Sequence, residues 1–317
     1  MTERFTVSPS PHVWGKNSVS RVMLDVILAL MPAAVASTYF FGLRVLFIIG
    51  ISIASAVLTE AIIQLIRKKP ITTGDLSAVV TGLLLAYTLP STVPLWIPAI
   101  GSFTAIALVK QAFGGLGQNF MNPALTARAI LFAAWPMHMI MYAIPGVDGM
   151  TTATPLALLK AGENELPSLW YAFVGNIGGS LGETSALALI LGAAYLLFRK
   201  IISWRIPFVF IGTVGLLTWI LGSEGLFTGQ GIYSIFLGGL ILGAFFMATD
   251  YVSSPLTPKG KIIMGIGCGI LTVVIRLYGG YPEGVTYAIL IMNLFVPLID
   301  RYTMPRVFGE EKKKWAT

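Results

Sequence analysis

The residues best placed to do chemistry are the threonines of a short polar heptad, Asp-Gly-Met-Thr-Thr-Ala-Thr, at residues 148–154. A threonine hydroxyl is a poor nucleophile without a neighbouring base, and nothing in the heptad suggests self-activation, so covalent chemistry at Thr154 requires a separate transferase. Pro155 favours an extended backbone at Thr154, which would present the hydroxyl to such an enzyme. Asp148 is a candidate recognition or metal-contact residue for it. The plain alternative is an Asp-Gly turn followed by threonines, which is common in loops.

A second polar stretch, residues 114–128, is rich in glycine and side-chain amides and leads into an apolar segment. Pro123 is typical of the first turn of a helix. The amides of Asn119 and Asn122 can hydrogen-bond the edge of a bound heterocycle. The alternative is that Asn122 caps the helix and Asn119 shapes the turn before it.

Charged residues inside apolar segments are also candidates, because an unpaired charge in a membrane is costly. Arg128 is expected either in an ion pair or in contact with a cofactor. Asp250 follows an interrupted apolar segment and is a candidate cofactor or cation contact. The other acidic residues near or within spans could line a cation route. For those near predicted helix ends the alternative is solvation at the membrane interface; they are Asp25, Asp75, Glu183, Glu283 and Asp300, while Glu60 lies further inside.

The counts of cysteine and histidine exclude several redox cofactors. Cys268 is the only cysteine, so the chain cannot supply four thiolates to an iron–sulfur cluster. His12 and His138 are the only histidines, and His12 lies in a polar tail, which argues against a bis-histidine haem. No metal site is expected. Any electron carrier here is therefore organic or is shared with another chain.

Composition places the chain in a membrane. Of 317 residues, 56% are hydrophobic and 11% are charged, whereas soluble domains carry about 25% charged residues. Charge-free runs cover 18 residues at 26–43, 18 residues at 206–223 and 25 residues at 225–249. A bilayer core about 30 Å thick needs roughly 20 apolar residues per helix, so these runs predict membrane spans. No cleavage site follows the first run, so no signal peptide is expected.

Ten membrane helices are predicted, over residues 21–42, 44–66, 75–90, 94–111, 122–137, 183–199, 205–222, 232–249, 261–278 and 284–300. With the N-terminus inside, 17 of the 21 Lys and Arg fall on cytoplasmic segments, as the positive-inside rule expects. The predicted organisation is a cytoplasmic tail (1–20), a first five-helix repeat (21–137), an extracytoplasmic loop with the heptad (138–182), a second five-helix repeat (183–300) and a basic cytoplasmic tail (301–317).

A weak internal repeat relates the two halves. Gly-Leu-Leu-Leu at 82–85 corresponds to Gly-Leu-Ile-Leu at 239–242. Each is followed by a proline-containing break, an apolar helix and a Gly-Gly pair. Because five helices is an odd number, the copies would be inverted, with a binding region near the midplane. Chance recurrence of glycine and leucine is the alternative. The predicted fold class is an all-α polytopic membrane protein with a 5+5 inverted repeat.

The heptad resembles the D-G-x-[ST]-x-A-T signature of the NqrB/RnfD family, and the similarity extends to residues 8–12, 119–128 and 247–250. The resemblance implies FMN esterified through its phosphate to Thr154. A flavin transferase would recognise the motif residues Asp148, Gly149, Thr151, Thr152 and Ala153. It also implies non-covalent riboflavin near Asn119 and Asn122, with Asp250 as a further candidate contact. Thr152 stands where such motifs often have glycine, which leaves the attachment hydroxyl unaffected.

The chain is most similar to the shorter, Rnf-type members of this family, whose fold is the ten-helix inverted repeat of urea-transporter-like proteins. This similarity implies a membrane subunit of an ion-translocating (Na⁺ or H⁺) ferredoxin:NAD oxidoreductase, relaying electrons between FMN and riboflavin. It would be inactive alone, and its implied partners are the other Rnf subunits and membrane lipid, not nucleic acid. The implied location is the bacterial or archaeal cytoplasmic membrane.

A channel or transporter for a small polar solute on the same fold is the competing interpretation. The paired interrupted helices favour it, but a permease has no reason to contain the heptad. A purely structural scaffold for other subunits is weaker for the same reason.

Overall fold

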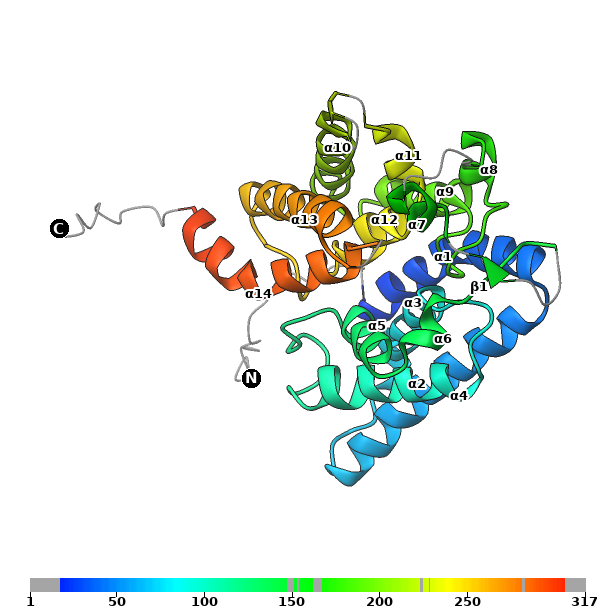
Figure 1. The fold of residues 1–317 in the computed structure, drawn as a ribbon. Coiled ribbons are helices and arrows are strands. Elements are labelled where there is room, and N and C mark those ends of the chain that lie inside the picture. Colours follow the sequence, from blue (N-terminus) through cyan, green and yellow to red (C-terminus); the bar gives the residue numbers. More distant parts are fainter. Residues whose placement is uncertain are drawn as a thin grey trace, which may run out of the picture.

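The computed structural model describes residues 18–146, 151–152, 154–161, 167–222, 225–227, 229–280 and 283–305. Helices dominate these ranges (Figure 1). The first part contains α1 (Val19–Phe41), α2 (Arg44–Ile66), the 3₁₀ turn η1 (Thr73–Asp75), α3 (Ser77–Tyr87), α4 (Trp96–Thr104), the π-helical η2 (Ala105–Gln111), α5 (Pro123–Ala134) and α6 (Pro136–Ile140). The second part contains α7 (Pro155–Ala161), α8 (Leu169–Val174), α9 (Ala186–Phe198), α10 (Arg205–Ile220), α11 (Gly231–Phe236), α12 (Leu240–Leu242), the π-helical η3 (Gly243–Met247), α13 (Pro258–Tyr278) and α14 (Val285–Thr303).

Two short antiparallel hairpins depart from a purely α-helical fold. β1 (Tyr142–Ala143) pairs with β2 (Thr151–Thr152), and β3 (Leu221–Gly222) pairs with β4 (Gly225–Leu226). Each strand has only two residues, so the hairpins close connections between helices and form no sheet layer. The first hairpin matters for function because β2 carries part of the heptad.

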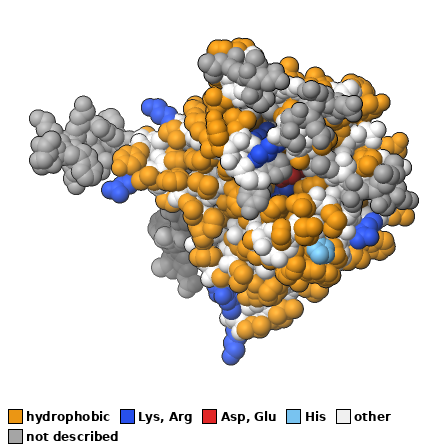
Figure 2. Space-filling view, in the orientation of Figure 1, with side chains coloured by type: hydrophobic (Ala, Val, Ile, Leu, Met, Phe, Trp, Pro, Cys, Tyr) orange, Lys and Arg blue, Asp and Glu red, His pale blue; other side chains and the backbone are white. Residues whose placement is uncertain are grey.

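Within the described residues, four helices are long and apolar enough to cross a bilayer: α1, α2, α13 and α14. Shorter apolar helices are α3, α5, α9 and α10. Large apolar side chains lie exposed along the bundle, and the face in Figure 2 is covered mainly by hydrophobic groups. Apolar patches of this extent mark membrane contact, so the chain is a polytopic, helical membrane protein. Ten spans and the inverted repeat stay predictions.

Most predicted helices lie within a few residues of their predicted bounds, but two are broken: helix 122–137 divides at Trp135 into α5 and α6, and helix 232–249 divides around residues 237–239. There the predicted helix 232–249 breaks into α11, α12 and η3, with Gly238 at φ +75°. A Cβ at Gly239 would lie 2.7 Å from Glu183 Oε1, and one at Gly238 would lie 3.4 Å from Arg276 Nη2. The break therefore makes room for two buried charged side chains, which hydrophobic periodicity does not register.

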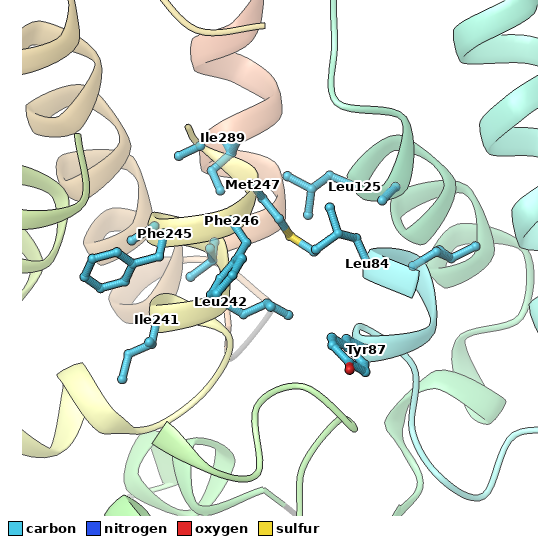
Figure 3. Packing of buried hydrophobic residues seen from close by; sticks show 14 of the residues in the cluster. Leu84, Tyr87, Leu125, Ile241, Leu242, Phe245, Phe246, Met247 and Ile289 are labelled. Carbon is cyan, nitrogen blue, oxygen red and sulfur yellow. The ribbon is translucent and has the colours of Figure 1, made fainter. Parts of the chain in front are cut away.

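The bundle has two groups of helices that meet around α5. In the first group α2 packs on α3 and α4; in the second α10 packs on α13, and α13 on α14. α1 crosses to α9, and α5 contacts both α3 and α14. These groups occupy opposite sides of Figure 1. Their buried faces meet in one apolar core, where Met247 of η3 extends toward Leu84 of α3 and Leu125 of α5 (Figure 3).

Part of the predicted extracytoplasmic loop, residues 138–182, lies within this core. Leu181 N donates to Leu89 O at 3.0 Å, and Gly182 N donates to Tyr87 O at 2.7 Å. A Cβ at Gly182 would lie 2.6 Å from Tyr87 Cβ, so only glycine permits this approach. The docked segment carries Glu183 into the interior, at a position with a side chain 3% exposed.

Candidate functional site

Thr154 lies where the β1–β2 hairpin ends and α7 begins. Its carbonyl oxygen accepts from Ala157 N at 2.8 Å and from Leu158 N at 3.0 Å, and its Oγ1 accepts from Ala157 N at 3.2 Å. Thr154 is therefore the N-cap of α7, a position that favours threonine. The residue is 7% exposed.

This burial differs from the expectation that Thr154 presents its hydroxyl to a transferase. Pairing of Thr152 with Tyr142 folds the segment back onto the bundle, and capping of α7 fixes the side chain there. The motif residues Asp148, Gly149 and Ala153 lie outside the described residues, and Thr151 is described only by its backbone in β2.

The side chain of Thr154 borders a cavity of about 280 Å³, called here the Thr154 cavity. Its walls are mainly aromatic and aliphatic, and Arg128 is the one basic side chain among the described residues that line it. Figure 2 shows acidic side chains only in a hollow near the centre of the visible face, beside basic ones. The lining residues are Arg128, Ala129, Phe132, Ile140, Tyr142, Thr154, Ala157, Glu283, Gly284, Thr286 and Tyr287.

Arg128 makes two buried ion pairs. Its Nη1 lies 3.3 Å from Glu183 Oε1, and its Nη2 donates to Glu283 Oε2. The exposed side-chain fractions are 7% for Arg128, 3% for Glu183 and 14% for Glu283. A guanidinium suits such a site because its planar fork can serve two carboxylates at once.

Arg276, in the last turn of α13, completes the cluster. Its Nε donates to Glu283 O at 3.0 Å, its Nη1 to Ser234 O at 2.7 Å and its Nη2 to Leu237 O at 3.3 Å. Tyr142 OH donates to Glu283 Oε1 at 3.4 Å. The interpretation of Glu183 as a solvated residue at a helix end was wrong, because the docked segment before α9 lies inside the bundle; Glu283, just before α14, is partly buried.

The three residues expected near riboflavin come together in a second pocket of about 110 Å³, called here the Asn119 pocket. Asn119, Asn122 and Asp250 all line it, with apolar walls from α3 and η3 that include Leu84, Phe245 and Phe246. Asp250 lies more than 100 residues from the two asparagines in the sequence. The chain segments meet because Asn122 Nδ2 donates to Met247 O at 3.3 Å.

The two asparagines serve mainly the local fold. Asn122 Oδ1 accepts from Ala124 N at 3.0 Å and from Leu125 N at 3.2 Å, which is the predicted cap of α5. Asn119 Nδ2 donates to Met121 O at 3.0 Å, which shapes the turn. Asp250 accepts from Ser253 Oγ at 2.8 Å. Burial raises the pKa of the Asp250 carboxyl, and the hydrogen bond from Ser253 opposes that rise.

A further buried ion pair borders the Asn119 pocket and was not singled out from the sequence. Lys110 Nζ lies 2.7 Å from Glu60 Oε1 and donates to Ser77 Oγ at 2.6 Å. Gln111 Nε2 donates to the same Glu60 oxygen at 2.8 Å. Within the described residues, Glu60 Oε2 has no hydrogen-bond partner. The signal in the sequence was a carboxylate and a lysine, each inside an apolar run.

Both cavities lie along α5. Asn122, Pro123 and Ala124 line the Asn119 pocket, while Arg128, Ala129 and Phe132 line the Thr154 cavity. At about 1.5 Å of rise per residue, the two linings are separated by about 10 Å along the helix axis. No group of three or more His, Cys, Asp or Glu side chains is arranged to hold a metal ion within the part of the chain that the structure describes.

These features define a polytopic membrane protein with two adjacent cavities on one helix. The chain matches the model of the NQR2, RnfD, RnfE family over residues 6–309 and belongs to that family.

Curated relatives agree with this assignment. The chain is 54% identical over 313 residues to the D component of the Na⁺-translocating ferredoxin:NAD⁺ oxidoreductase complex of Acetobacterium woodii, covering 98% of this chain and 96% of the relative. It is 50% identical over 321 residues to the D component of the proton-translocating ferredoxin:NAD⁺ oxidoreductase complex of Clostridium ljungdahlii, covering 97% of each. The D component of the ion-translocating oxidoreductase complex of Stutzerimonas stutzeri is 39% identical over 333 residues, covering 94% of each.

Proposed function

We propose that this chain is the flavin-bearing membrane subunit of an ion-translocating ferredoxin:NAD oxidoreductase. In this proposal FMN is held by a phosphoester at Thr154, and riboflavin binds in the Asn119 pocket. The other subunits of the complex are its partners, and a flavin transferase matures it. Membership of the NQR2, RnfD, RnfE family and nearly full-length similarity to the D components of such complexes support the proposal. Their names give both Na⁺ and H⁺, so the proposal covers ion translocation without choosing the ion.

The observation that carries the proposal is the position of Thr154 beside Arg128 in one cavity. A guanidinium is a strong hydrogen-bond donor to phosphate, and Phe132, Tyr142 and Tyr287 offer aromatic surface to a planar ring. The residues therefore fit a flavin whose phosphate is esterified to the threonine. When bound, the flavin supplies the electron transfer, while the protein supplies position and electrostatics.

The Asn119 pocket fits a flavin less completely. Its apolar walls suit the ring, but Asn122 already uses both ends of its amide, which leaves Asn119 Oδ1 and Asp250 as the available groups among the three residues expected near riboflavin. The separation of about 10 Å along α5 supports a relay between the two cavities. The positive-inside pattern supports an extracytoplasmic Thr154 cavity and cytoplasmic termini.

In-gel flavin fluorescence tests the attachment. The complex is expressed with its flavin transferase, denatured and separated on a gel. We expect a fluorescent band for the native chain and none for Thr154→Val, because valine removes the hydroxyl but keeps the shape. Thr213→Val, at a threonine that bonds its own helix α10, and Cys268→Ala retain the band.

The mass of the intact chain measures the same modification independently. The native chain gains the mass of one flavin mononucleotide, and Thr154→Val gains none. An unmodified native chain from working complexes would remove the case for an electron carrier and leave a solute conduit as the better function.

A further inference from the structure

The cluster around Arg128 holds two positive and two negative side chains in the interior: Arg128, Arg276, Glu183 and Glu283. Their charges cancel. Isolated charges are costly to bury, and a neutral set with hydrogen bonds on every member is tolerated. The cluster joins both helix groups, since α5 supplies Arg128 while Arg276 ends α13 and Glu283 precedes α14.

A phosphoester at Thr154 would disturb this balance. Such a diester carries one negative charge, and Arg128, the one basic side chain among the described lining residues, is already paired with two carboxylates. The filled cavity would therefore hold one uncompensated negative charge at low dielectric, where charges interact strongly. Uptake of one positive charge would restore the net charge of the cavity and the Arg128 cluster to zero.

Resting on the proposed function, we infer that Glu283 is the residue that restores neutrality, by binding a proton from solvent when the cavity holds the phosphoester. The bond formed is O–H on the Glu283 carboxylate, and the proton comes from water. Protonation releases Nη2 of Arg128 from its carboxylate partner, so the guanidinium can turn toward the phosphate. Glu283 is thus a positioning residue, acting through Arg128.

Position and exposure favour Glu283 over Glu183 as the carboxylate that binds the proton. Glu283 lines the Thr154 cavity and its side chain is 14% exposed, so solvent protons reach it. Glu183 is 3% exposed and is packed against Gly239. The groups facing Glu283 are Arg128 of α5, Tyr142 of β1, Arg276 of α13, Glu183 before α9 and Tyr287 of α14.

The midpoint potential of the covalent flavin, measured against pH in the purified complex, tests this inference. A more negative surrounding lowers the potential, because adding an electron becomes harder. Glu283→Gln mimics the protonated residue, so we expect its potential to be raised at alkaline pH and to follow only the pH dependence that the flavin's own proton uptake gives. The native potential should meet that value at acid pH and fall below it as the pH rises through deprotonation of Glu283.

Charge counting orders the remaining variants at alkaline pH. Arg128→Gln has the lowest potential, and the double variant Arg128→Gln/Glu283→Gln returns near the native value because its net charge is the same. Arg128→Lys keeps the positive charge, so its flavin potential stays near the native value. This variant serves as the test if Arg128→Gln does not fold. Asp25→Asn, a carboxylate paired with Arg199 and outside both cavities, leaves the potential unchanged.

The outcomes separate the two proposals. Absence of in-gel fluorescence from the native chain overturns the proposed function. A fluorescent native chain whose flavin potential shows the same pH dependence with and without Glu283→Gln overturns this inference and leaves the function standing.

Discussion

The Thr154 cavity and the Asn119 pocket share α5 but use their polar groups in opposite ways. At the Asn119 pocket, Lys110 is held by Glu60 and Ser77, and both ends of the Asn122 amide are bonded within the fold. At the Thr154 cavity, Arg128 and Glu283 are paired and also line the open space.

This difference separates charges that hold helices together from charges that meet a ligand. A buried ion pair by itself is weak support for either role, because its desolvation cost offsets much of its attraction. What distinguishes the Thr154 cavity is that both Arg128 and Glu283 line it, whereas only Lys110 of the other pair lines the Asn119 pocket. The following substitutions test whether the two regions differ as described.

The largest effect is expected from Lys110→Met. It leaves Glu60 buried without its cation, which costs about 3–5 kcal/mol of stability. Lys110→Met/Glu60→Gln should recover most of the loss, because the remaining groups are neutral. Thermal unfolding of the purified protein in detergent measures both. Equal stability of the single and double variants would contradict a structural role for the pair.

A smaller loss is expected from Gly239→Ala. The new methyl group would lie 2.7 Å from Glu183 Oε1 and push the carboxylate away from Arg128. Overpacking of this kind costs about 1–3 kcal/mol, measured by the same unfolding assay. Gly50→Ala is the matched control: nothing lies within 4 Å of its added atom, and alanine should stabilise the interior of α2 by up to about 1 kcal/mol. Equal effects would show that Glu183 is not confined.

The smallest effect is expected from Asn122→Ala, which removes the cap of α5 and costs about 1 kcal/mol. Asn122→Asp keeps the accepting oxygen and should lose less. Unfolding temperature and extracted riboflavin are measured together. Loss of riboflavin at unchanged stability would show that Asn122 binds the ligand. The Asn119 pocket would then resemble the Thr154 cavity, where polar side chains meet a ligand.

Long apolar runs allowed most helices to be predicted from the sequence, because their length and lack of charge are local properties. α5 begins at Pro123 behind its Asn122 cap, as the local pattern predicts. The grouping of Asn119, Asn122 and Asp250 was also anticipated, through the family resemblance and the repeat. The attachment of FMN to Thr154 stays a prediction.

The partners of Arg128 could not be predicted, because Glu183 and Glu283 lie 55 and 155 residues further along the chain. Their positions at apparent helix ends suggested contact with water. Only the docking of residues 180–182 against the end of α3, and the glycine break before α12, bring them inside. Such long-range packing leaves no periodic pattern in the chain.

The burial of Thr154 has a consequence for the order of biogenesis. A maturation enzyme needs the hydroxyl within its own catalytic centre, yet here the oxygen accepts from Ala157 N and the residue is enclosed by the bundle. Under the proposed function, attachment of FMN would therefore precede the packing of α7 against the bundle, or α7 would have to move away and return. The short β1–β2 hairpin and the seven-residue helix α7 would then enclose the attached flavin only after the modification.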